Sequence, residues 1–259
     1  MDTVSQKICE IGVVPVIKLN HPERDAAPLA KALIAGGVPV AEVTFRAAGA
    51  AAAIRTMREQ FPEMLVGAGT VLTTKQIDEA MDAGAQFIVT PGLDTELVAY
   101  CQKKNIPIFP GCTTPTDYHT AYKYGLEVLK FFPAEQSGGL KKIKAMSAPF
   151  PMFKVMPTGG ISLNNLKEYL SSPVIAACGG SYMVSADLID NGRWDEITEL
   201  CRQSVAIAKE ARGGTCQEWV GDVAVLSFIL SANSTRFCTS SAYFCFHSAI
   251  STDSRFTVS

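Results

Sequence analysis

Apolar and polar positions alternate along the chain in two repeating forms. Short runs rich in β-branched and aromatic residues are followed by longer segments in which apolar residues recur every three or four positions. The first form is typical of buried strands and the second of amphipathic helices. The short runs predict eight strands, at residues 13–19, 38–46, 65–71, 86–91, 106–111, 128–134, 153–158 and 174–178.

The longer segments predict helices, and local signals place several of their ends. Thr73 and Asp94 are N-cap candidates, and Thr114 or Thr116 starts a further helix that stops at Gly125. The predicted helices cover residues 23–35, 47–60, 74–83, 95–104, 114 or 116 to 125, 139–146, 164–170 and 194–211.

This alternation of strands and helices is typical of βαβ units with a parallel sheet. Eight units without a ninth favour a closed (β/α)8 barrel, the α/β fold also called a TIM barrel. The alternative is an open, doubly wound sheet. Against that alternative, Leu72 stands where the dinucleotide-binding motif that begins at Gly67 and Gly69 requires its third glycine.

Composition narrows the function classes. The 259-residue chain is 47% hydrophobic and has a formal net charge of -2, which argues against nucleic-acid binding and against a polybasic membrane surface. The first ten residues contain no apolar signal segment. The longest apolar run, 220–230, is too short to span a membrane and contains Asp222. We therefore expect a cytoplasmic protein.

Neither a metal nor another cofactor is expected. The 8 cysteines form no Cys-x-x-Cys pair, and His21, His119 and His247 share no ligand spacing with them. Without an export signal, we expect most cysteines to be reduced and to pack as small hydrophobic residues.

The character of the chain changes after Arg212. Residues 213–259 contain no lysine and no proline, and they do not continue the strand–helix period. We therefore expect two parts, a barrel at 1–212 and a C-terminal tail at 213–259 that is disordered or loosely packed outside the barrel. A tail that folds back on the barrel, and one that arises from a reading-frame artefact, are the alternatives.

One lysine interrupts the apolar run at 128–135, which reads Val-Leu-Lys-Phe-Phe-Pro-Ala-Glu. Burial of Lys130 in a strand disfavours its charged ammonium form and favours the neutral amine, which is a nucleophile. The run therefore offers a candidate Schiff-base lysine. The alternative is a structural lysine that reaches water or pairs with a carboxylate.

Side chains two residues apart in a strand share a face, so the pattern brings several polar groups together. We expect an inward-facing set on each of three strands, comprising Glu42, Thr44 and Arg46, then Val66, Ala68 and Thr70, then Val128, Lys130 and Phe132. In the functional interpretation Lys130 attacks a ketone, Arg46 holds a carboxylate, Glu42 moves protons and Thr70 orients the ligand. The alternative is an internal network of ion pairs in which Glu42 pairs with Arg46 or Lys130.

Two glycine pairs follow the last two predicted strands. Gly159-Gly160 comes after the seventh strand, and Gly179-Gly180-Ser181 comes after the eighth. Loops at these positions of a barrel commonly bind phosphate through backbone N–H groups and a helix N-terminus. A glycine pair alone often marks only a turn, but two pairs at these positions predict a phosphate site.

Several motifs, in order from about Val13 to Ala211, resemble those of the 2-keto-3-deoxy-6-phosphogluconate (KDPG) aldolases, a family that includes the 4-hydroxy-2-oxoglutarate (KHG) aldolases. The resemblance rests on Val43-Thr44-Phe45-Arg46, Gly67-Ala68-Gly69-Thr70-Val71, Pro91-Gly92, Phe109-Pro110-Gly111, Lys130-Phe131-Phe132-Pro133-Ala134-Glu135, Pro157-Thr158-Gly159-Gly160 and Gly179-Gly180-Ser181. It implies a metal-independent class I aldolase of the Entner–Doudoroff pathway, a (β/α)8 barrel and a homotrimer. One departure is Ala47-Ala48-Gly49-Ala50, where relatives often carry polar residues.

The same resemblance implies roles for individual residues. Lys130 would form the Schiff base and Glu42 would be the general acid and base. The substrate would be bound by Arg46, Thr70, Pro91, Phe132 and Thr158, and its phosphate by Gly159, Gly160, Gly179, Gly180 and Ser181. The implied reaction cleaves KDPG to pyruvate and glyceraldehyde 3-phosphate.

Two other functions stay open at this point. One is cleavage of the non-phosphorylated KHG, alone or beside KDPG. The other is a barrel that binds a sugar phosphate without chemistry, which would need neither the lysine nor the carboxylate.

Overall fold

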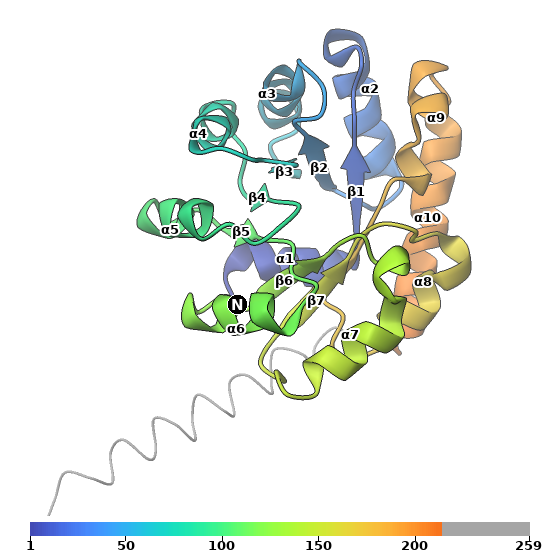
Figure 1. The fold of residues 1–259 in the computed structure, drawn as a ribbon. Helices are drawn as coiled ribbons and strands as arrows, with labels where there is room; N and C mark the ends of the chain where they lie inside the picture. Colours follow the sequence, from blue (N-terminus) through green and yellow to red (C-terminus); the bar gives the residue numbers. More distant parts are fainter. Residues whose placement is uncertain (214–259) are drawn as a thin grey trace, which may run out of the picture. The chain divides into compact units, whose positions relative to one another are not determined.

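The computed structural model describes residues 1–213, which are drawn in colour in Figure 1. The predicted tail, 213–259, lies outside the described residues apart from Gly213. The described part contains eight strands, each followed by at least one helix: β1 (Val13–Ile17), β2 (Val40–Thr44), β3 (Leu65–Gly69), β4 (Ile88–Val89), β5 (Ile108–Phe109), β6 (Val128–Phe131), β7 (Lys154–Pro157) and β8 (Cys178–Gly180).

The helices lie around the strands in Figure 1. They are α1 (Thr3–Ile11), α2 (Pro22–Ala35), α3 (Ala50–Gln60), α4 (Thr74–Asp82), α5 (Thr95–Lys103), α6 (Pro115–Lys123), α7 (Gly139–Ser147), α8 (Leu163–Leu170), α9 (Ala186–Asp190) and α10 (Trp194–Ala211), with short 3-10 helices η1 (Glu135–Ser137) and η2 (Tyr182–Val184). The predicted caps are confirmed, because Thr73, Asp94 and Thr114 each accept a hydrogen bond from the first turn of their helix.

All strand pairs in the described part are parallel. Six strands form one sheet in the order β5-β4-β3-β2-β1-β8, and β6 pairs with β7. Isolated parallel bridges connect the two groups, from Gly111 to Lys130 on one side and from Thr158 to Gly179 on the other. The result is a curled parallel α/β sheet that carries β6 beside β5 and β7 beside β8.

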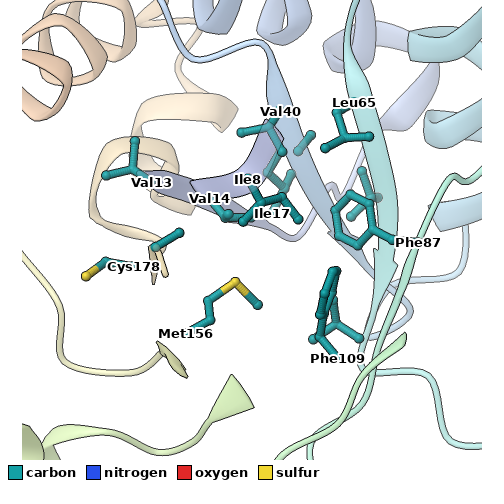
Figure 2. Packing of buried hydrophobic residues seen from close by; sticks show 14 of the residues in the cluster. Ile8, Val13, Val14, Ile17, Val40, Leu65, Phe87, Phe109, Met156 and Cys178 are labelled. Carbon is teal, nitrogen blue, oxygen red and sulfur yellow. The ribbon is translucent and has the colours of Figure 1, made fainter. Parts of the chain in front are cut away.

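The register decides which side chains share the inner face. Residues that pair with each other on adjacent parallel strands have their side chains on the same face of the sheet. Glu42 pairs with Val16 on one side and with Gly67 on the other, and Lys130 pairs with Met156. Figure 2 shows Met156 in the packed interior near Phe109 and Val14. Glu42 and Lys130 are therefore ionisable side chains on an inner surface that is largely apolar.

The interior is filled by apolar side chains. Val14, Phe87 and Met156 are completely buried, and Figure 2 shows them in the packed interior. Ile17, which pairs with Val43, is equally buried on the other face of the sheet. Ile8 of α1 packs into the same cluster, so this first helix also covers part of the core. Burial of apolar surface on this scale is the main force that holds the strands together.

The structure corrects the eighth strand. We expected it at 174–178, but β8 covers Cys178–Gly180, and Gly179 and Gly180 pair with Val14 and Pro15 of β1. These two glycines therefore belong to a strand and not to a loop. Glycine is needed at this point of the strand, because a Cβ on Gly179 would lie 2.3 Å from Thr158 Oγ1.

The inward face predicted for the third strand is also wrong. Glu42 pairs with Gly67 and Thr44 pairs with Gly69, so the two glycines share the face of Glu42, whereas Ala68 pairs with Val43 on the other face. Thr70 lies beyond the end of β3, where strict alternation no longer applies. Helices α1 and α9 were not predicted, whereas α10 has the bounds that its periodicity indicates.

In residues 1–213, every helix is too short or too polar to cross a lipid bilayer.

Candidate active site

A buried lysine and a buried glutamate form the centre of the site. Lys130 Nζ lies 3.3 Å from Glu42 Oε1, and the two side chains are only 5% and 0% exposed. The second oxygen, Glu42 Oε2, is buried and has no protein hydrogen-bond partner. Because an unpaired buried carboxylate oxygen is costly, this atom is a candidate contact for a ligand.

Glycines create the space for this pair. A Cβ on Gly69 would lie 2.3 Å from Glu42 Oε1, so the carboxylate occupies the volume that a side chain would fill. Gly111 bridges to Lys130 on the other side, and a Cβ there would lie 2.1 Å from the carbonyl oxygen of Pro91. The glycine motifs after β3 and β5 thus allow close approach of side chain and backbone to the lysine strand.

Arg46 lies two residues beyond the C-terminal end of β2. Its Nε donates a hydrogen bond to Thr44 Oγ1 at 3.3 Å, and Thr44 in turn donates to the carbonyl oxygen of Ile17 at 2.8 Å. Thr44 is buried, whereas Arg46 is exposed. The guanidinium is therefore anchored at one nitrogen and has further N–H groups for a carboxylate.

Thr70 has an unusual backbone conformation. Its φ angle is +55°, in the left-handed region that β-branched residues rarely adopt. Such strained positions cluster at functional sites, where the surrounding structure holds them. Thr70 directly follows Gly69, the residue over which the Glu42 carboxylate lies.

Phe132 and Thr158 are close to the lysine strand. The ring centroid of Phe132 lies 5.2 Å from Lys130 Nζ, and the side chain is 38% exposed. Thr158 is buried, and its Oγ1 has no protein hydrogen-bond partner. Thr158, directly after β7, also bridges to Gly179 of β8, so its free hydroxyl lies next to the strand that carries the lysine.

The glycine pair after β7 adopts a loop that requires glycine. Gly159 and Gly160 have φ angles of +99° and +79°. Gly160 is exposed and Gly159 is partly buried, so their backbone N–H groups are near the surface. Ser181, the N-cap of η2, is exposed directly after β8. Backbone N–H groups in such turns form cavities that suit an anion.

The described residues contain no group of three or more histidine, cysteine, aspartate or glutamate side chains that could hold a metal ion. The cysteines nearest the site are buried. Burial raises the pKa of the Cys112 and Cys178 thiols well above the ordinary value, so both stay protonated at neutral pH. They pack as small hydrophobic residues and are unreactive.

Sequence reasoning missed a group of polar residues next to the Gly159-Gly160 loop. The Tyr169 hydroxyl donates a short hydrogen bond to Glu135 Oε1, and Asn165 Nδ2 donates to the carbonyl oxygen of Gly160 at 3.0 Å. Glu135 and Tyr169 are 34 residues apart, so no local pattern reports their contact. The one available signal was the spacing of Asn165 and Tyr169, which places both on one face of a helix.

Comparisons with known proteins agree with this geometry. The model of the aldolase family "KDPG and KHG aldolase" matches residues 4–200. A 2-dehydro-3-deoxy-phosphogluconate aldolase of Haemophilus influenzae is 47% identical over 206 residues, which are 80% of this chain and 97% of that protein. A KHG/KDPG aldolase of Escherichia coli is 44% identical over 211 residues, again 80% of this chain and 97% of the relative.

Solved structures give the same result. The chain resembles the crystal structure of KDPG aldolase from Legionella pneumophila, with pyruvate captured at low pH as a covalent carbinolamine intermediate. The TM-score is 0.74 at 42% identity, over 76% of this chain and 96% of that one. The KDPG aldolase of Zymomonas mobilis with 3-phosphoglycerate has a TM-score of 0.74 at 37% identity, over 78% and 95% of the two chains. The family predicted from the motifs is thus confirmed, and the chain belongs to the KDPG and KHG aldolase family.

Proposed function

We propose that this protein cleaves KDPG to pyruvate and glyceraldehyde 3-phosphate through a Schiff base on Lys130. The observation that carries the proposal is the Lys130 amine, which is buried in a parallel strand 3.3 Å from a fully buried carboxylate. A purely structural ion pair would not need the free, buried oxygen of Glu42 or the free hydroxyl of Thr158 beside it. The covalent pyruvate adduct of the Legionella relative supports the same chemistry.

The reaction follows from the two groups. The Lys130 Nζ adds as a nucleophile to the ketone carbon, and loss of water from the carbinolamine gives a protonated imine. The imine nitrogen accepts the electron pair when the bond between the third and fourth carbons breaks. Glu42, directly or through a water molecule, removes the proton of the hydroxyl group on the fourth carbon. Glyceraldehyde 3-phosphate leaves, the enamine is protonated at the third carbon, and water hydrolyses the imine to release pyruvate.

The remaining residues bind the two ends of the substrate in this proposal. Arg46 holds the carboxylate, because its guanidinium has free N–H groups while Thr44 fixes its position. Thr70, Pro91, Phe132 and Thr158 surround the reacting carbons. The phosphate contacts the backbone of Gly159 and Gly160 and lies near Ser181. Gly179 and Gly180, in the strand that precedes Ser181, line the same phosphate site.

We also propose that 1–212 forms a closed (β/α)8 barrel. The bridges from β5 to β6 and from β7 to β8 support closure, since they join the six-stranded and two-stranded sheets at both sides. We further propose that the protein is a homotrimer in the cytoplasm. The family resemblance implies the trimer, and exposed Leu72, two residues after Thr70, would suit a subunit contact. Native mass measurement tests the assembly, which a monomeric mass would contradict.

KHG is the second candidate substrate, favoured by the Escherichia coli relative, whose name includes both activities. The two substrates share the 2-keto acid end that Lys130 and Arg46 would bind. They differ at the other end, because only KDPG carries a phosphate for the glycine loops. Activity toward both is therefore compatible with the site.

Turnover measurements with purified protein test this proposal. Incubation with KDPG should release pyruvate and glyceraldehyde 3-phosphate in equal amounts, and chelators should not change the rate. Cleavage of KHG at a lower kcat/KM would establish dual activity. Release of pyruvate from neither substrate would overturn the proposed function.

A further inference from the structure

The loop that carries Gly159 and Gly160 is held from two sides by side chains that have no part in the proposed imine chemistry. On one side, Asn165 Nδ2 donates to the Gly160 carbonyl at 3.0 Å, while Asn165 Oδ1 accepts from the Ser162 N–H at 2.9 Å. On the other side lies Glu135, which directly follows the lysine strand and its proline turn.

Glu135 is in close contact with Gly160. A Cβ on Gly160 would lie 2.5 Å from Glu135 Cγ and 2.7 Å from Glu135 Cβ, so the aliphatic part of the glutamate occupies that space. The backbones are also joined, since the Glu135 N–H donates to the Gly159 carbonyl at 3.1 Å. The position of the Glu135 side chain therefore limits where the glycine loop can lie.

Tyr169 fixes the end of the Glu135 side chain. Tyr169 is 1% exposed, and its hydroxyl donates to Glu135 Oε1. Burial, and then the Glu135 carboxylate, raise the pKa of Tyr169 well above its ordinary value, so the hydroxyl stays a donor at neutral pH. Gly139 leaves room for this hydrogen bond, because a Cβ on Gly139 would lie 3.1 Å from Glu135 Oε1 and 3.1 Å from the Tyr169 hydroxyl oxygen.

Asn165 and Tyr169 come from the same helix. They are four residues apart in α8, so they lie on one face, and this face reaches both sides of the loop. Asn165 holds the backbone of the loop directly, and Tyr169 acts through Glu135. One short helix thus connects the segment after the lysine strand with the segment after β7.

We propose that Tyr169 and Glu135 are positioning residues that hold the Gly159-Gly160 loop in the conformation that binds the substrate phosphate. This inference rests on the proposed function, because it assigns a support to its phosphate site. The pair should govern binding of the phosphorylated end and leave the imine step unaffected. Loss of binding energy that is equal in substrate and transition state raises KM without changing kcat.

Tyr169→Phe is the sharpest test, since it removes only the hydroxyl. We expect the KM for KDPG to rise about five- to tenfold, as for loss of the net contribution of one typical hydrogen bond, with kcat unchanged. The pyruvate concentration that gives half-maximal borohydride trapping should stay at the wild-type value, because pyruvate has no phosphate. Inorganic phosphate should also become a weaker competitive inhibitor.

A matched control is available in the same chain. Tyr100 donates to the Asp78 carboxylate at 2.7–2.8 Å between α5 and α4, away from the glycine loops. Tyr100→Phe removes the same kind of hydrogen bond and should leave the KM for KDPG unchanged. An equal rise in KM in both variants would overturn the inference, because it would indicate a general loss of packing.

Glu135→Ala gives a second route if Tyr169→Phe does not fold, since Glu135 is exposed. It should raise the KM for KDPG at least as much, and the double variant should be no worse than Glu135→Ala alone. Wild-type KM in Glu135→Ala, or a fall in kcat together with weaker pyruvate trapping, would overturn the positioning role. Failure of the wild-type protein to cleave KDPG would instead overturn the proposed function.

Discussion

Two lysine–carboxylate pairs in this protein show why distance alone does not identify a functional site. Lys104 and Asp78 lie 2.6 Å apart, with side chains 46% and 45% exposed. Lys130 and Glu42 are farther apart, at 3.3 Å, but only 5% and 0% exposed. Water surrounds and screens the shorter pair, whereas the longer pair is shielded from water by the protein.

The surroundings of the two pairs differ as well. In the exposed pair both carboxylate oxygens of Asp78 have partners, because Asp78 accepts from Tyr100 as well as from Lys104. The hydrogen bond with Lys104, and then that with Tyr100, lowers the pKa of Asp78, and the Asp78 carboxylate raises the pKa of Lys104. The buried pair keeps Glu42 Oε2 without a protein partner. A satisfied pair stabilises a surface, whereas a buried pair with a free oxygen can act on a ligand.

The largest expected effect is loss of the amine. Lys130→Met keeps an unbranched side chain that is one atom shorter and cannot form an imine, so we expect kcat/KM for KDPG to fall by about 10⁴-fold or more. Turnover assays and a thermal unfolding scan of the same sample separate lost chemistry from lost folding. Activity near the wild-type level in a folded variant would leave Lys130 as a structural residue.

Replacing the carboxylate should have the next largest effect. Glu42→Gln keeps the shape and removes the base, so we expect kcat to fall by about 10²–10⁴-fold. Trapping of pyruvate on Lys130 should continue, since the amine remains. A variant that turns over like the wild type would make Glu42 an ion-pair partner only.

Moving the carboxylate without changing its charge should have a smaller effect. Gly69→Ala places a Cβ 2.3 Å from the present position of Glu42 Oε1, so the carboxylate must shift. A displacement of about 1 Å costs about 10²-fold in rate in well-ordered sites. Gly92→Ala is the control, because a Cβ there meets nothing within 4 Å. Equal kcat in the two variants would show that the position of Glu42 is not critical.

The smallest effect is expected at the exposed pair. Asp78→Asn should leave kcat and KM unchanged, because the pair lies on α4 and α5, away from the lysine strand. Its stability effect should depend on pH. The pKa of Asp78 is lower in the folded state, so its contribution is present above about pH 4, the unfolded value, and is lost as the pH falls further.

Thermal unfolding of wild type and Asp78→Asn between pH 2 and pH 8 checks this sign. The difference in Tm should be constant near neutral pH and should shrink below about pH 4. A difference that grows as the solution becomes acidic would mean that Asp78 is not stabilised by Lys104 and Tyr100.

Local signals in the sequence were sufficient for most of the elements. The cap at Asp94 and the bounds of α10 depend on neighbouring residues, and both were predicted correctly. The strand that carries Lys130 was also predicted, because its run is short, apolar and closed by a proline. Gly179 and Gly180 were assigned to a loop because glycine pairs commonly mark turns, yet they pair with Val14 and Pro15 of β1 and so lie in a strand.

Contacts between distant segments could not be predicted in the same way. The inward face of β3 depends on its register with β2, and Gly67 and Gly69 have no side chains that would reveal it. The Tyr169 hydrogen bond to Glu135 joins residues from two loop–helix units. Such pairs follow from the three-dimensional arrangement, and a single sequence contains no periodic signal for them.

Borohydride reduction in the presence of pyruvate, followed by peptide mass mapping, tests the central claim most directly. The reduced adduct should add mass to one lysine, Lys130, whose amine is buried beside Glu42. Lys104, in the shorter but exposed pair, should stay unmodified and serves as the internal control. Labelling at Lys104 or another lysine, or no labelling at all, would contradict the account.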